Sequence, residues 1–297
     1  MQLIKTYRFI LLLIYRITGF IFTRTGILKF QSIKKLYSLI ILKLKSKLIS
    51  DVVVLDGHKI FLDSVDSLFL SIDGEYQVFE KEIMEKEIES GDTVLDIGAN
   101  IGYFTMIFAD LVGACGKVFA FEPDPDNFAL LKRNIEENGY KNVELIQKAA
   151  LNRTGMHKLY LCEDNRADHR VYDSHDGRSW IEIHAVELDD YFKNYDGKID
   201  FIKIDVQGAE GSVIEGMLDL LDMNKDIKIV TEFWPFGLKR SGFDPAEFLK
   251  LVIKSHFDLF ELDSQKKKVE AVKIEDLLRK YSVENQKFTD LLCIKYE

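Results

Sequence analysis

The feature that most constrains this chain is an apolar strand that runs directly into a glycine-bearing turn and then into a helix. Residues 93–97 read as the strand, and the turn after it carries Gly98 and Gly102. Gly98 permits a tight turn and close approach of a ligand to the backbone, and Gly102 permits close packing of the following helix. The first N–H groups of that helix point toward a ligand in the turn. This unit predicts a cofactor site at the carboxyl end of a parallel sheet.

Acidic residues at the ends of three strands narrow the class of cofactor. Asp96 ends the first strand, where it would repel a pyrophosphate but tolerates a cationic sulfonium. Glu122 ends the second strand and is placed to accept hydrogen bonds from ribose hydroxyls, while Asp124 is the expected cap of the next helix. Asp205 ends the third strand, where ligands of open α/β sheets bind. The pattern favours S-adenosylmethionine over a dinucleotide.

The rest of the body alternates between strands and helices, which is typical of βαβ units and a parallel sheet covered on both faces. A hairpin with a type I′-like turn at Asp56-Gly57 and a helix precede this part. A polar loop of residues 163–179 interrupts it between two further strands. We predict strands at residues 93–97, 117–121, 143–146, 157–162, 180–186, 201–204, 227–233 and 289–295. We predict helices at about residues 78–89, 102–112, 125–138, 208–221 and 245–255.

Taken together, these motifs resemble the FkbM family of methyltransferases. The matching segments are residues 91–103, 120–123, 149–151, 188–190, 199–205 and 208–210, with Asn127, Leu131, Asn134, Asn138 and Gly139 between them. The resemblance covers about residues 71–260. It implies a class I methyltransferase fold, which is a Rossmann-like, seven-stranded, mostly parallel sheet, here with a β-hairpin insertion and an N-terminal helical arm. It also implies S-adenosylmethionine as cofactor and O-methylation of a hydroxyl.

The resemblance also assigns roles to individual residues. Asp96, Gly98 and Asn100 would surround the methionine part, Glu122 would hold the ribose, and residues 147–150 would lie near adenine. The cofactor-binding residues implied in this way are Asp96, Gly98, Ala99, Asn100, Gly102, Tyr103, Glu122, Pro123, Lys148, Ala149 and Asp205. The chain departs from the family pattern at Gln207, where the family commonly has Glu. This departure removes a carboxylate near the acceptor and leaves the identity of the general base open.

Two segments have the composition expected of an acceptor site. Residues 164–173 are dense in hydrogen-bonding side chains, and residues 231–237, with Glu232, Trp234 and Phe236, close a strand at the same sheet edge as Asp205. A long polar loop over a rigid sheet is a usual site of specificity, although a solvated loop and core aromatics explain the same patterns. The candidates for the general base are Asp205, His169 and Glu232, in that order. No spacing of side chains demands a metal, so none is expected.

Charge divides the chain into an arm and a body. Residues 1–50 hold 10 of the 40 basic residues and no acid, so the remaining 30 basic residues face 49 acidic ones, a net of −19. An acidic body argues against nucleic acid as a partner. The three cysteines, Cys115, Cys162 and Cys293, lie far apart and suggest neither zinc nor a disulfide framework, which fits a reducing compartment.

The basic arm has several interpretations. Apolar residues recur at helical spacing over residues 33–48 with lysines between them, which indicates an amphipathic helix that lies on an anionic membrane or packs on the body. The apolar run before it, residues 9–22, is short for a membrane span and lacks the cleavage site of a signal peptide. We therefore expect a cytoplasmic protein with peripheral contact at the inner face of the membrane.

The sequence thus predicts an S-adenosylmethionine-dependent O-methyltransferase that acts on a sugar, glycolipid or related small metabolite. The expected divisions are a basic helical arm at residues 1–50, a hairpin and helix at residues 51–90, and a methyltransferase domain at residues 91–297. One alternative is a binding protein that keeps the fold without catalysis. Another is an NAD-dependent dehydrogenase, which would need a GxGxxG spacing that residues 98–102 lack.

Overall fold

The computed structural model describes residues 49–295. The predictions for the arm, namely the apolar run of residues 9–22 and the basic helix of residues 33–48, lie outside the described residues. Among the helices of residues 49–295, none combines the length and the apolar character that a membrane span requires.

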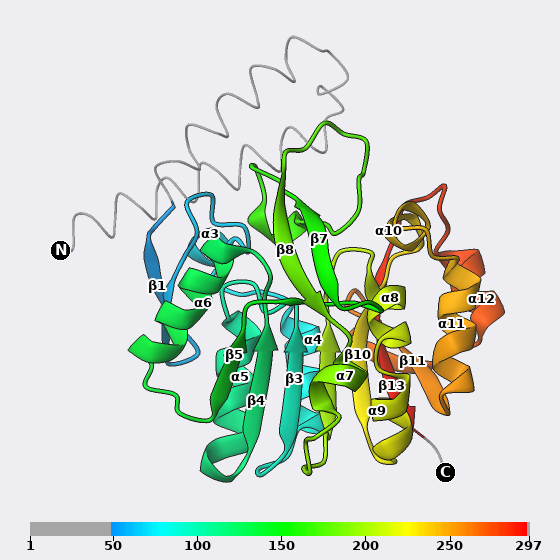
Figure 1. Cartoon of the computed structure of the whole chain (residues 1–297), viewed down its shortest axis with the longest axis horizontal. Coiled ribbons are helices and arrows are strands. Elements are labelled where there is room, and N and C mark those ends of the chain that lie inside the picture. The colour runs from blue at the N-terminus through cyan, green and yellow to red at the C-terminus, as the bar shows by residue number, and fades with distance from the viewer. Residues whose placement is uncertain (1–48, 296–297) are drawn as a thin grey trace.

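A central sheet of eight strands forms the middle layer (Figure 1). Its spatial order is β12 (Lys268–Ala271), β11 (Phe257–Asp263), β13 (Thr289–Lys295), β10 (Lys228–Phe233), β9 (Phe201–Ile204), β3 (Thr93–Ile97), β4 (Lys117–Phe121) and β5 (Val143–Ile146). The strands from β10 to β5 are parallel, whereas β13 runs antiparallel to both β10 and β11. Because both faces of the parallel strands are covered, their sequences are almost continuously apolar.

Six of these strands lie at predicted positions, β11 is the seventh strand of the sheet, and β12 extends it at the edge. The prediction from sequence missed β11 and β12. In β11 the charged residues Asp258, Glu261 and Asp263 interrupt the apolar pattern, and all four residues of β12 are exposed. An edge hairpin of this kind carries neither the apolar run nor the strict alternation that reveals a strand.

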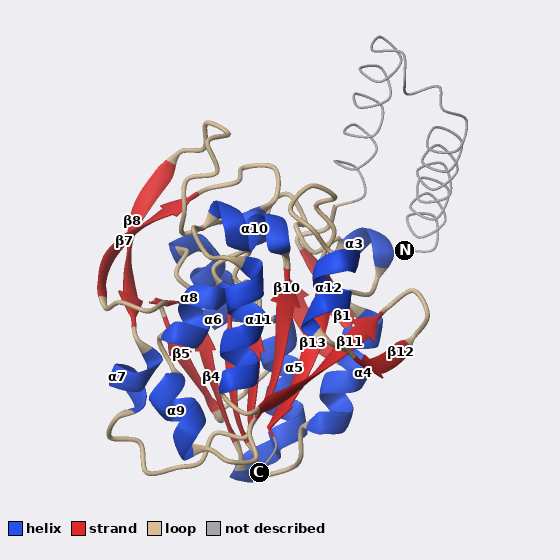
Figure 2. Cartoon of the chain, turned by 90° about the vertical axis from the view of Figure 1, so that its right-hand side faces the viewer, coloured by secondary structure: helices blue, strands red, loops and turns tan. Residues whose placement is uncertain are grey.

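Helices cover both faces of the sheet (Figure 2). One face carries α3 (Leu70–Asp73), α4 (Val78–Glu87), α5 (Tyr103–Val112) and α6 (Pro125–Glu137). The other carries α7 (Leu188–Phe192), α8 (Glu210–Glu215), α9 (Leu218–Met223), α10 (Pro235–Arg240), α11 (Pro245–Lys254) and α12 (Ile274–Lys280). The single helix predicted for residues 208–221 is wrong. It is divided at Gly216, whose Cα passes so close to the Leu151 carbonyl that a Cβ would lie 2.2 Å from that oxygen.

The predicted insertion is a second, three-stranded sheet of β6 (Ala149–Ala150), β8 (Trp180–Val186) and β7 (Gly155–Tyr160). Its hairpin β7–β8 rises beyond the carboxyl ends of the central strands (Figure 1). The polar loop of residues 161–179 joins the two strands, and the short 3-10 helix η3 (Arg166–Asp168) lies within it. The insertion is therefore positioned over the edge of the sheet where the strand-end acids lie.

The N-terminal hairpin of β1 (Val52–Leu55) and β2 (His58–Phe61) has the predicted turn, because Asp56 and Gly57 both have positive φ, of 50° and 84°. Asn134 of α6 fixes this hairpin to the body. Its Oδ1 accepts from the Phe61 N–H at 2.7 Å, and its Nδ2 donates to the carbonyls of Phe61 at 3.0 Å and Ile101 at 2.8 Å. One buried amide thus joins the hairpin to the glycine turn.

Candidate cofactor and acceptor site

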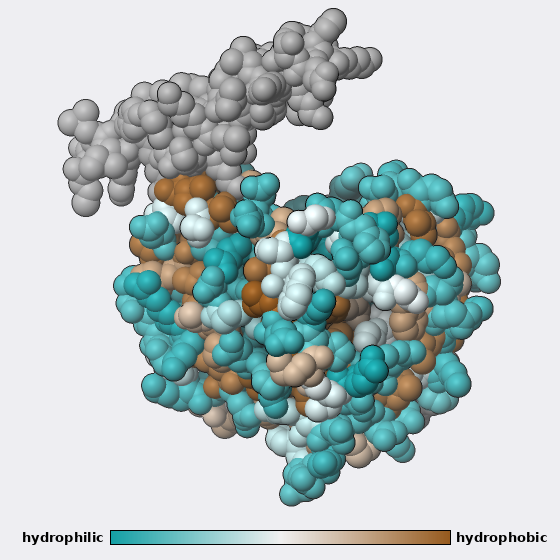
Figure 3. Space-filling view, turned by 45° about the horizontal axis from the view of Figure 1, so that its top comes forward, coloured by the Kyte–Doolittle hydropathy of each residue, from teal (hydrophilic) through white to brown (hydrophobic). Residues whose placement is uncertain are grey.

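A cavity opens at the carboxyl ends of β3, β4 and β9, beneath the inserted loop. It encloses about 810 Å³ of empty space, part of which is open to solvent. Seen from this end, the surface is mostly hydrophilic around a hollow in which apolar residues are visible (Figure 3). The mixed polar and apolar lining suits a small-molecule ligand.

The glycine turn brings three strand ends together at the floor of this cavity. Gly98 has a φ of 82°, and a Cβ on it would lie 2.0 Å from the carbonyl oxygen of Asp205. The N–H groups of Gly98 and Ala99 both donate to the Phe121 carbonyl at 3.0 Å. Glycine is therefore required here for close contact between β3 and β9, a reason additional to the ligand approach that the sequence suggested.

Glu122 is the most desolvated acid in the lining of the cavity. Its side chain accepts hydrogen bonds from the N–H groups of Asn100 and Asp124, both at 2.9 Å, and it is 6% exposed. Burial raises the pKa of Glu122 to about 8, although the two amide donors oppose the shift. The carboxyl group is thus held in one orientation before any ligand binds. Asp124 caps α6 as predicted, accepting from the N–H groups of Asp126 and Asn127.

Asp96 lies below the cavity rather than in its lining. It is fully buried, with Oδ2 accepting from the Thr105 hydroxyl at 2.5 Å and Oδ1 3.5 Å from the Lys203 ammonium. Burial lowers the pKa of Lys203, but Asp96 and Asp205 outweigh it and raise that pKa above its usual value. The cation that offsets Asp96 in the structure is thus a lysine of the neighbouring strand.

Asp205 does line the cavity, and its two oxygens have different surroundings. Oδ1 accepts from the Gln207 side-chain amide at 2.7 Å, and Oδ2 lies 3.9 Å from the Lys203 ammonium. The side chain is 22% exposed. Asp205 is therefore a carboxylate that a ligand can reach, beside a buried cation.

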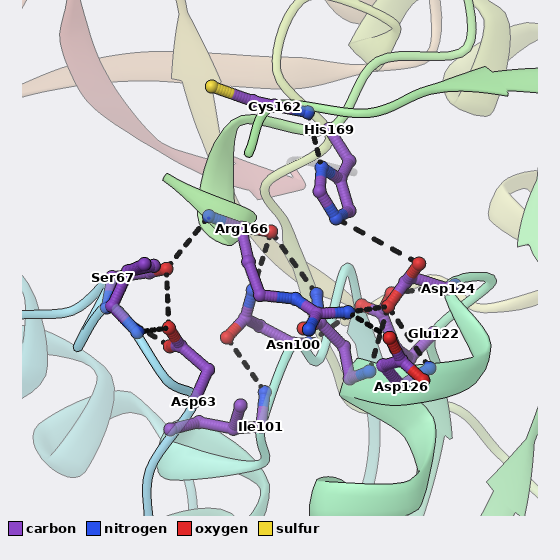
Figure 4. Close-up of polar contacts among 12 residues, drawn as sticks. Asp63, Ser67, Asn100, Ile101, Glu122, Asp124, Asp126, Cys162, Arg166 and His169 are labelled. Carbon is purple, nitrogen blue, oxygen red and sulfur yellow. Dashed lines mark hydrogen bonds and ion pairs between the residues drawn. The ribbon is translucent and has the colours of Figure 1, made fainter. Parts of the chain in front are cut away.

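The inserted loop closes the cavity through Arg166 (Figure 4). The Arg166 carbonyl accepts from the side-chain amides of Asn127 at 3.1 Å and Asn100 at 3.4 Å, and its N–H donates to the Ser67 hydroxyl at 2.8 Å. Its guanidinium forms ion pairs with the carboxylates of Asp124 at 3.1 Å and Asp126 at 2.8 Å. The loop is therefore tied to the glycine turn, to α6 and to the segment before α3.

His169 is on the same loop and lines the cavity, but both of its ring nitrogens are directed elsewhere. Nδ1 accepts from the Cys162 N–H at 3.0 Å, and Nε2 lies 3.8 Å from Asp124 Oδ2. Burial lowers the pKa of His169, which favours the neutral ring. In the neutral ring an accepting Nδ1 places the proton on Nε2, so the ring has no free lone pair with which to remove a proton.

Glu232 lies outside the cavity lining, among other acids. It is the cross-strand partner of Asp290 in the antiparallel pair of β10 and β13. Burial, followed by the charges of Asp205, Glu210 and Asp290, raises the pKa of Glu232 well above its usual value. Burial also raises the pKa of Asp290 to about 8. A carboxyl group that keeps its proton is poorly suited to accept another.

The structure thus gathers most of the predicted residues into one cavity. Its lining contains Gly98, Ala99, Asn100, Tyr103, Glu122, Pro123, Lys148, Ala149, His169 and Asp205. Asp96, Gly102 and Glu232 do not line it. A Cβ on Gly102 would instead contact Leu131 of α6 at 2.6 Å, so its close packing is against a helix. Trp234 and Phe236 also lie outside the lining, with their rings 5.6 Å apart.

Several lining residues were not predicted individually, among them Tyr76, Asn127, Arg166 and Lys203. Lys203 could have been found, because strand residues two apart share a face and Lys203 stands two before Asp205. The others come from segments whose position depends on tertiary packing. Within residues 49–295, no group of three or more metal-ligating side chains is arranged to hold an ion.

The sheet order, with one antiparallel strand between β10 and β11, and a cavity at the strand ends define a class I methyltransferase fold. The family model of the methyltransferase FkbM domain matches residues 96–258, which is more than half of the chain. The chain therefore belongs to the FkbM methyltransferase family. The predicted family and fold are confirmed, and the match supports the predicted enzyme class and S-adenosylmethionine as its cofactor.

Relatives resemble parts of the chain. The 31-O-demethyl-FK506 methyltransferase FkbM of Streptomyces tacrolimicus is 31% identical over 164 residues, which cover 45% of this chain and 62% of the relative. A protein-L-isoaspartate O-methyltransferase of Methanococcus maripaludis is 36% identical over 62 residues, 21% of this chain and 29% of the relative. The chain thus spans less than a third of the isoaspartate methyltransferases that it matches. A solved SAM-dependent O-methyltransferase from Thermotoga maritima is similar over 88% of this chain and 82% of that chain, at 13% identity and a TM-score of 0.43.

Proposed function

We propose that this protein transfers a methyl group from S-adenosylmethionine to a hydroxyl of a sugar, glycolipid or related metabolite. The observation that carries the proposal is the open carboxylate of Asp205 beside the glycine turn. The similarity to an enzyme named for a 31-O-demethyl substrate supports a hydroxyl as the acceptor.

The residues of the cavity fit the cofactor. Glu122 offers a pre-oriented carboxyl group for ribose hydroxyls, and Lys148 and Ala149 line the side of the cavity beyond β4. Asp96, Lys203 and Asp205 together leave one negative charge at the cavity wall, which suits a sulfonium cation. When bound, S-adenosylmethionine supplies an electrophilic methyl group.

Asp205 is the residue that we assign as general base. Its Oδ2 has no hydrogen bond within the described residues, so it can accept the proton of an acceptor hydroxyl while the oxygen of that hydroxyl gains the methyl group. Lys203 stays protonated and offsets the charge of the carboxylate. His169 and Glu232, the other two candidates, are less suited because the neutral His169 ring has no free lone pair and Glu232 retains its proton.

The test is a screen of hydroxylated sugars and glycolipids with S-adenosylmethionine labelled in its methyl group. We expect label on a hydroxyl oxygen, and a loss of about 100-fold or more in kcat for Asp205→Asn. The exposed Asp258→Asn on β11 is the matched control and should retain activity. Tight S-adenosylhomocysteine binding without transfer to any acceptor would instead favour a binding protein, and methylated nitrogen or carbon would contradict O-methylation.

We further propose that the N-terminal region contacts an anionic membrane. Residues 1–50 carry ten basic and no acidic residues. Val54 of β1, the strand that follows them in the sequence, is 71% exposed. Pelleting of the full chain with anionic and with neutral vesicles tests this. Replacing Lys34, Lys35, Lys43, Lys45 and Lys47 by Gln should reduce pelleting with anionic vesicles only, and equal pelleting of both proteins would contradict the proposal.

A further inference from the structure

The turn after β9 is clamped on several sides. Gln207 has a left-handed φ of 56°, and its carbonyl accepts from the Tyr172 hydroxyl at 3.0 Å. The Gly208 carbonyl accepts from the Ser241 hydroxyl at 2.7 Å. Glu210 Oε1 accepts from the N–H groups of Gly208 at 3.0 Å and of Val206 at 3.2 Å. A left-handed glutamine held in this way has its backbone fixed by the insertion, by the end of α10 and by α8.

This clamped backbone directs the Gln207 side chain at Asp205. The Gln207 Nε2 group donates to Asp205 Oδ1 at 2.7 Å, which leaves Oδ2 available to a ligand. Without that hydrogen bond, Asp205 could turn toward the Lys203 ammonium, which is 3.9 Å away, and form a closer ion pair. The carboxylate would then be directed at the buried cation and away from the cavity.

We propose that Gln207 is a positioning residue that holds the Asp205 carboxylate toward the reacting groups and away from Lys203. This inference rests on the proposed function, because it concerns the residue assigned there as general base. It also gives the inserted loop a role in catalysis, since Tyr172 of that loop holds the Gln207 backbone. The departure from the family pattern at residue 207 then substitutes an amide donor for a second carboxylate without loss of the site.

Binding of two cofactor forms tests the proposal without an acceptor. S-adenosylmethionine carries a sulfonium cation and S-adenosylhomocysteine a neutral sulfur, so the ratio of their affinities reports the carboxylate charge near that sulfur. A defect in folding or cavity shape weakens both ligands together and leaves the ratio unchanged. Calorimetry at pH 8 on the full chain measures both affinities.

The variants are chosen to isolate the hydrogen bond. Gln207→Met keeps the length without the donor, and Gln207→Asn keeps the amide but is too short to reach Asp205. Both should lower the ratio at least threefold, with S-adenosylhomocysteine bound within twofold of the wild-type affinity. Asp205→Asn should lower it about tenfold, since one charge near the sulfonium is lost. Gln265→Met, in an exposed turn, is the control and should leave the ratio unchanged.

A double-mutant cycle completes the test. Gln207→Met added to Asp205→Asn should lower the ratio no further, because Gln207 acts through Asp205. Additive effects, or an unchanged ratio in both Gln207 variants, would overturn the inference. That failure is distinct from failure of the proposed function, which would appear as absence of O-methyl transfer in a protein whose ratio still responds to Gln207.

Discussion

The turns after β3 and β9 occupy equivalent places in the fold but are stabilised in different ways. Each has an aspartate at or next to the end of its strand, and each contains a non-glycine residue with positive φ, Asn100 at 52° and Gln207 at 56°. Asn100 bonds within its own segment, where its Oδ1 accepts from the Ile101 N–H at 2.8 Å. Gln207 depends on Tyr172, which is 35 residues earlier in the chain. In the first turn the left-handed residue thus supports its own backbone through its side chain, whereas in the second turn a distant side chain holds the carbonyl of the left-handed residue.

The aspartates show the same contrast. Asp96 is fully buried beneath its turn and bonded to the helix that follows, whereas Asp205 is open to the cavity. A residue at the end of a strand can thus support the turn or contact the ligand, and the position alone does not decide which.

Gly98→Ala should have the largest effect, because it forces apart the two turns. Its Cβ would lie 2.0 Å from the Asp205 carbonyl oxygen at a φ of 82°. We expect a loss of about 3–5 kcal/mol in the free energy of unfolding, and loss of S-adenosylhomocysteine binding. Gly177→Ala is the matched control, with a φ of 83° and open space around it, and should cost only about 1–2 kcal/mol. Chemical denaturation measures both, and equal losses would show that the turns are not in tight contact.

Glu122→Gln should weaken S-adenosylhomocysteine binding about 10- to 100-fold near pH 8, since an amide is a poorer acceptor for ribose hydroxyls than a carboxylate. The pKa of Glu122 is about 8 in the free protein, so below that pH binding must first remove a proton. Wild-type affinity should therefore rise with pH, by at most tenfold per unit, and level off above about pH 8. Calorimetry from pH 6.5 to 9 measures this. The exposed Glu136→Gln is the control and should keep this pH dependence, whereas a pH dependence that persists in Glu122→Gln would belong to another group.

Asp290→Asn should flatten the dependence of stability on pH. The pKa of Asp290 is raised from 3.8 to about 8, so between those values the folded protein holds more protons than the unfolded chain. This group therefore makes the protein progressively less stable as pH rises from about 4 to 8. We expect the wild-type Tm to fall by several degrees from pH 6 to 8, and that of the variant to fall less. Asp258→Asn, at an exposed position on the next strand, is the control and should keep the wild-type dependence of Tm on pH. The same dependence of Tm on pH in the wild type and in Asp290→Asn would contradict the assignment.

Tyr172→Phe should have the smallest effect. It removes one hydrogen bond, from the Tyr172 hydroxyl to the Gln207 carbonyl, at a cost of about 1 kcal/mol in unfolding free energy. The affinity ratio of S-adenosylmethionine to S-adenosylhomocysteine should fall less than threefold, because the other contacts of the turn remain. A fall as large as that of Gln207→Met would mean that the insertion alone positions the second turn.

The same contrast explains which parts of the site could be predicted from sequence. Gly98, Glu122 and Asp205 can be predicted because continuous apolar strands end directly before them, and these signals are local. Lys203 lies within such a strand, where a single lysine between apolar residues does not indicate a site residue. Arg166 contributes through its carbonyl, which no side-chain pattern reports.

The fold follows a similar division. The parallel strands and their helices were located because both their faces are buried, which makes the sequence apolar throughout. Strand β11 was missed because charged residues interrupt its apolar pattern, and the edge strand β12 was missed because all four of its residues are exposed. The division of the predicted helix at Gly216 depends on the Leu151 carbonyl, which lies 65 residues earlier in the chain. Contacts between distant segments therefore decided most of the differences.

The Asn134 side chain couples the position of the N-terminal hairpin to that of the glycine turn. A single buried amide holds both Phe61, at the end of the hairpin, and the Ile101 carbonyl in the glycine turn. A tilt of the hairpin at its Val52 end would displace Phe61 and, through these three hydrogen bonds, the Ile101 carbonyl of the glycine turn. Any contact that orients the hairpin would therefore also affect the shape of the cavity, because the glycine turn forms part of its lining.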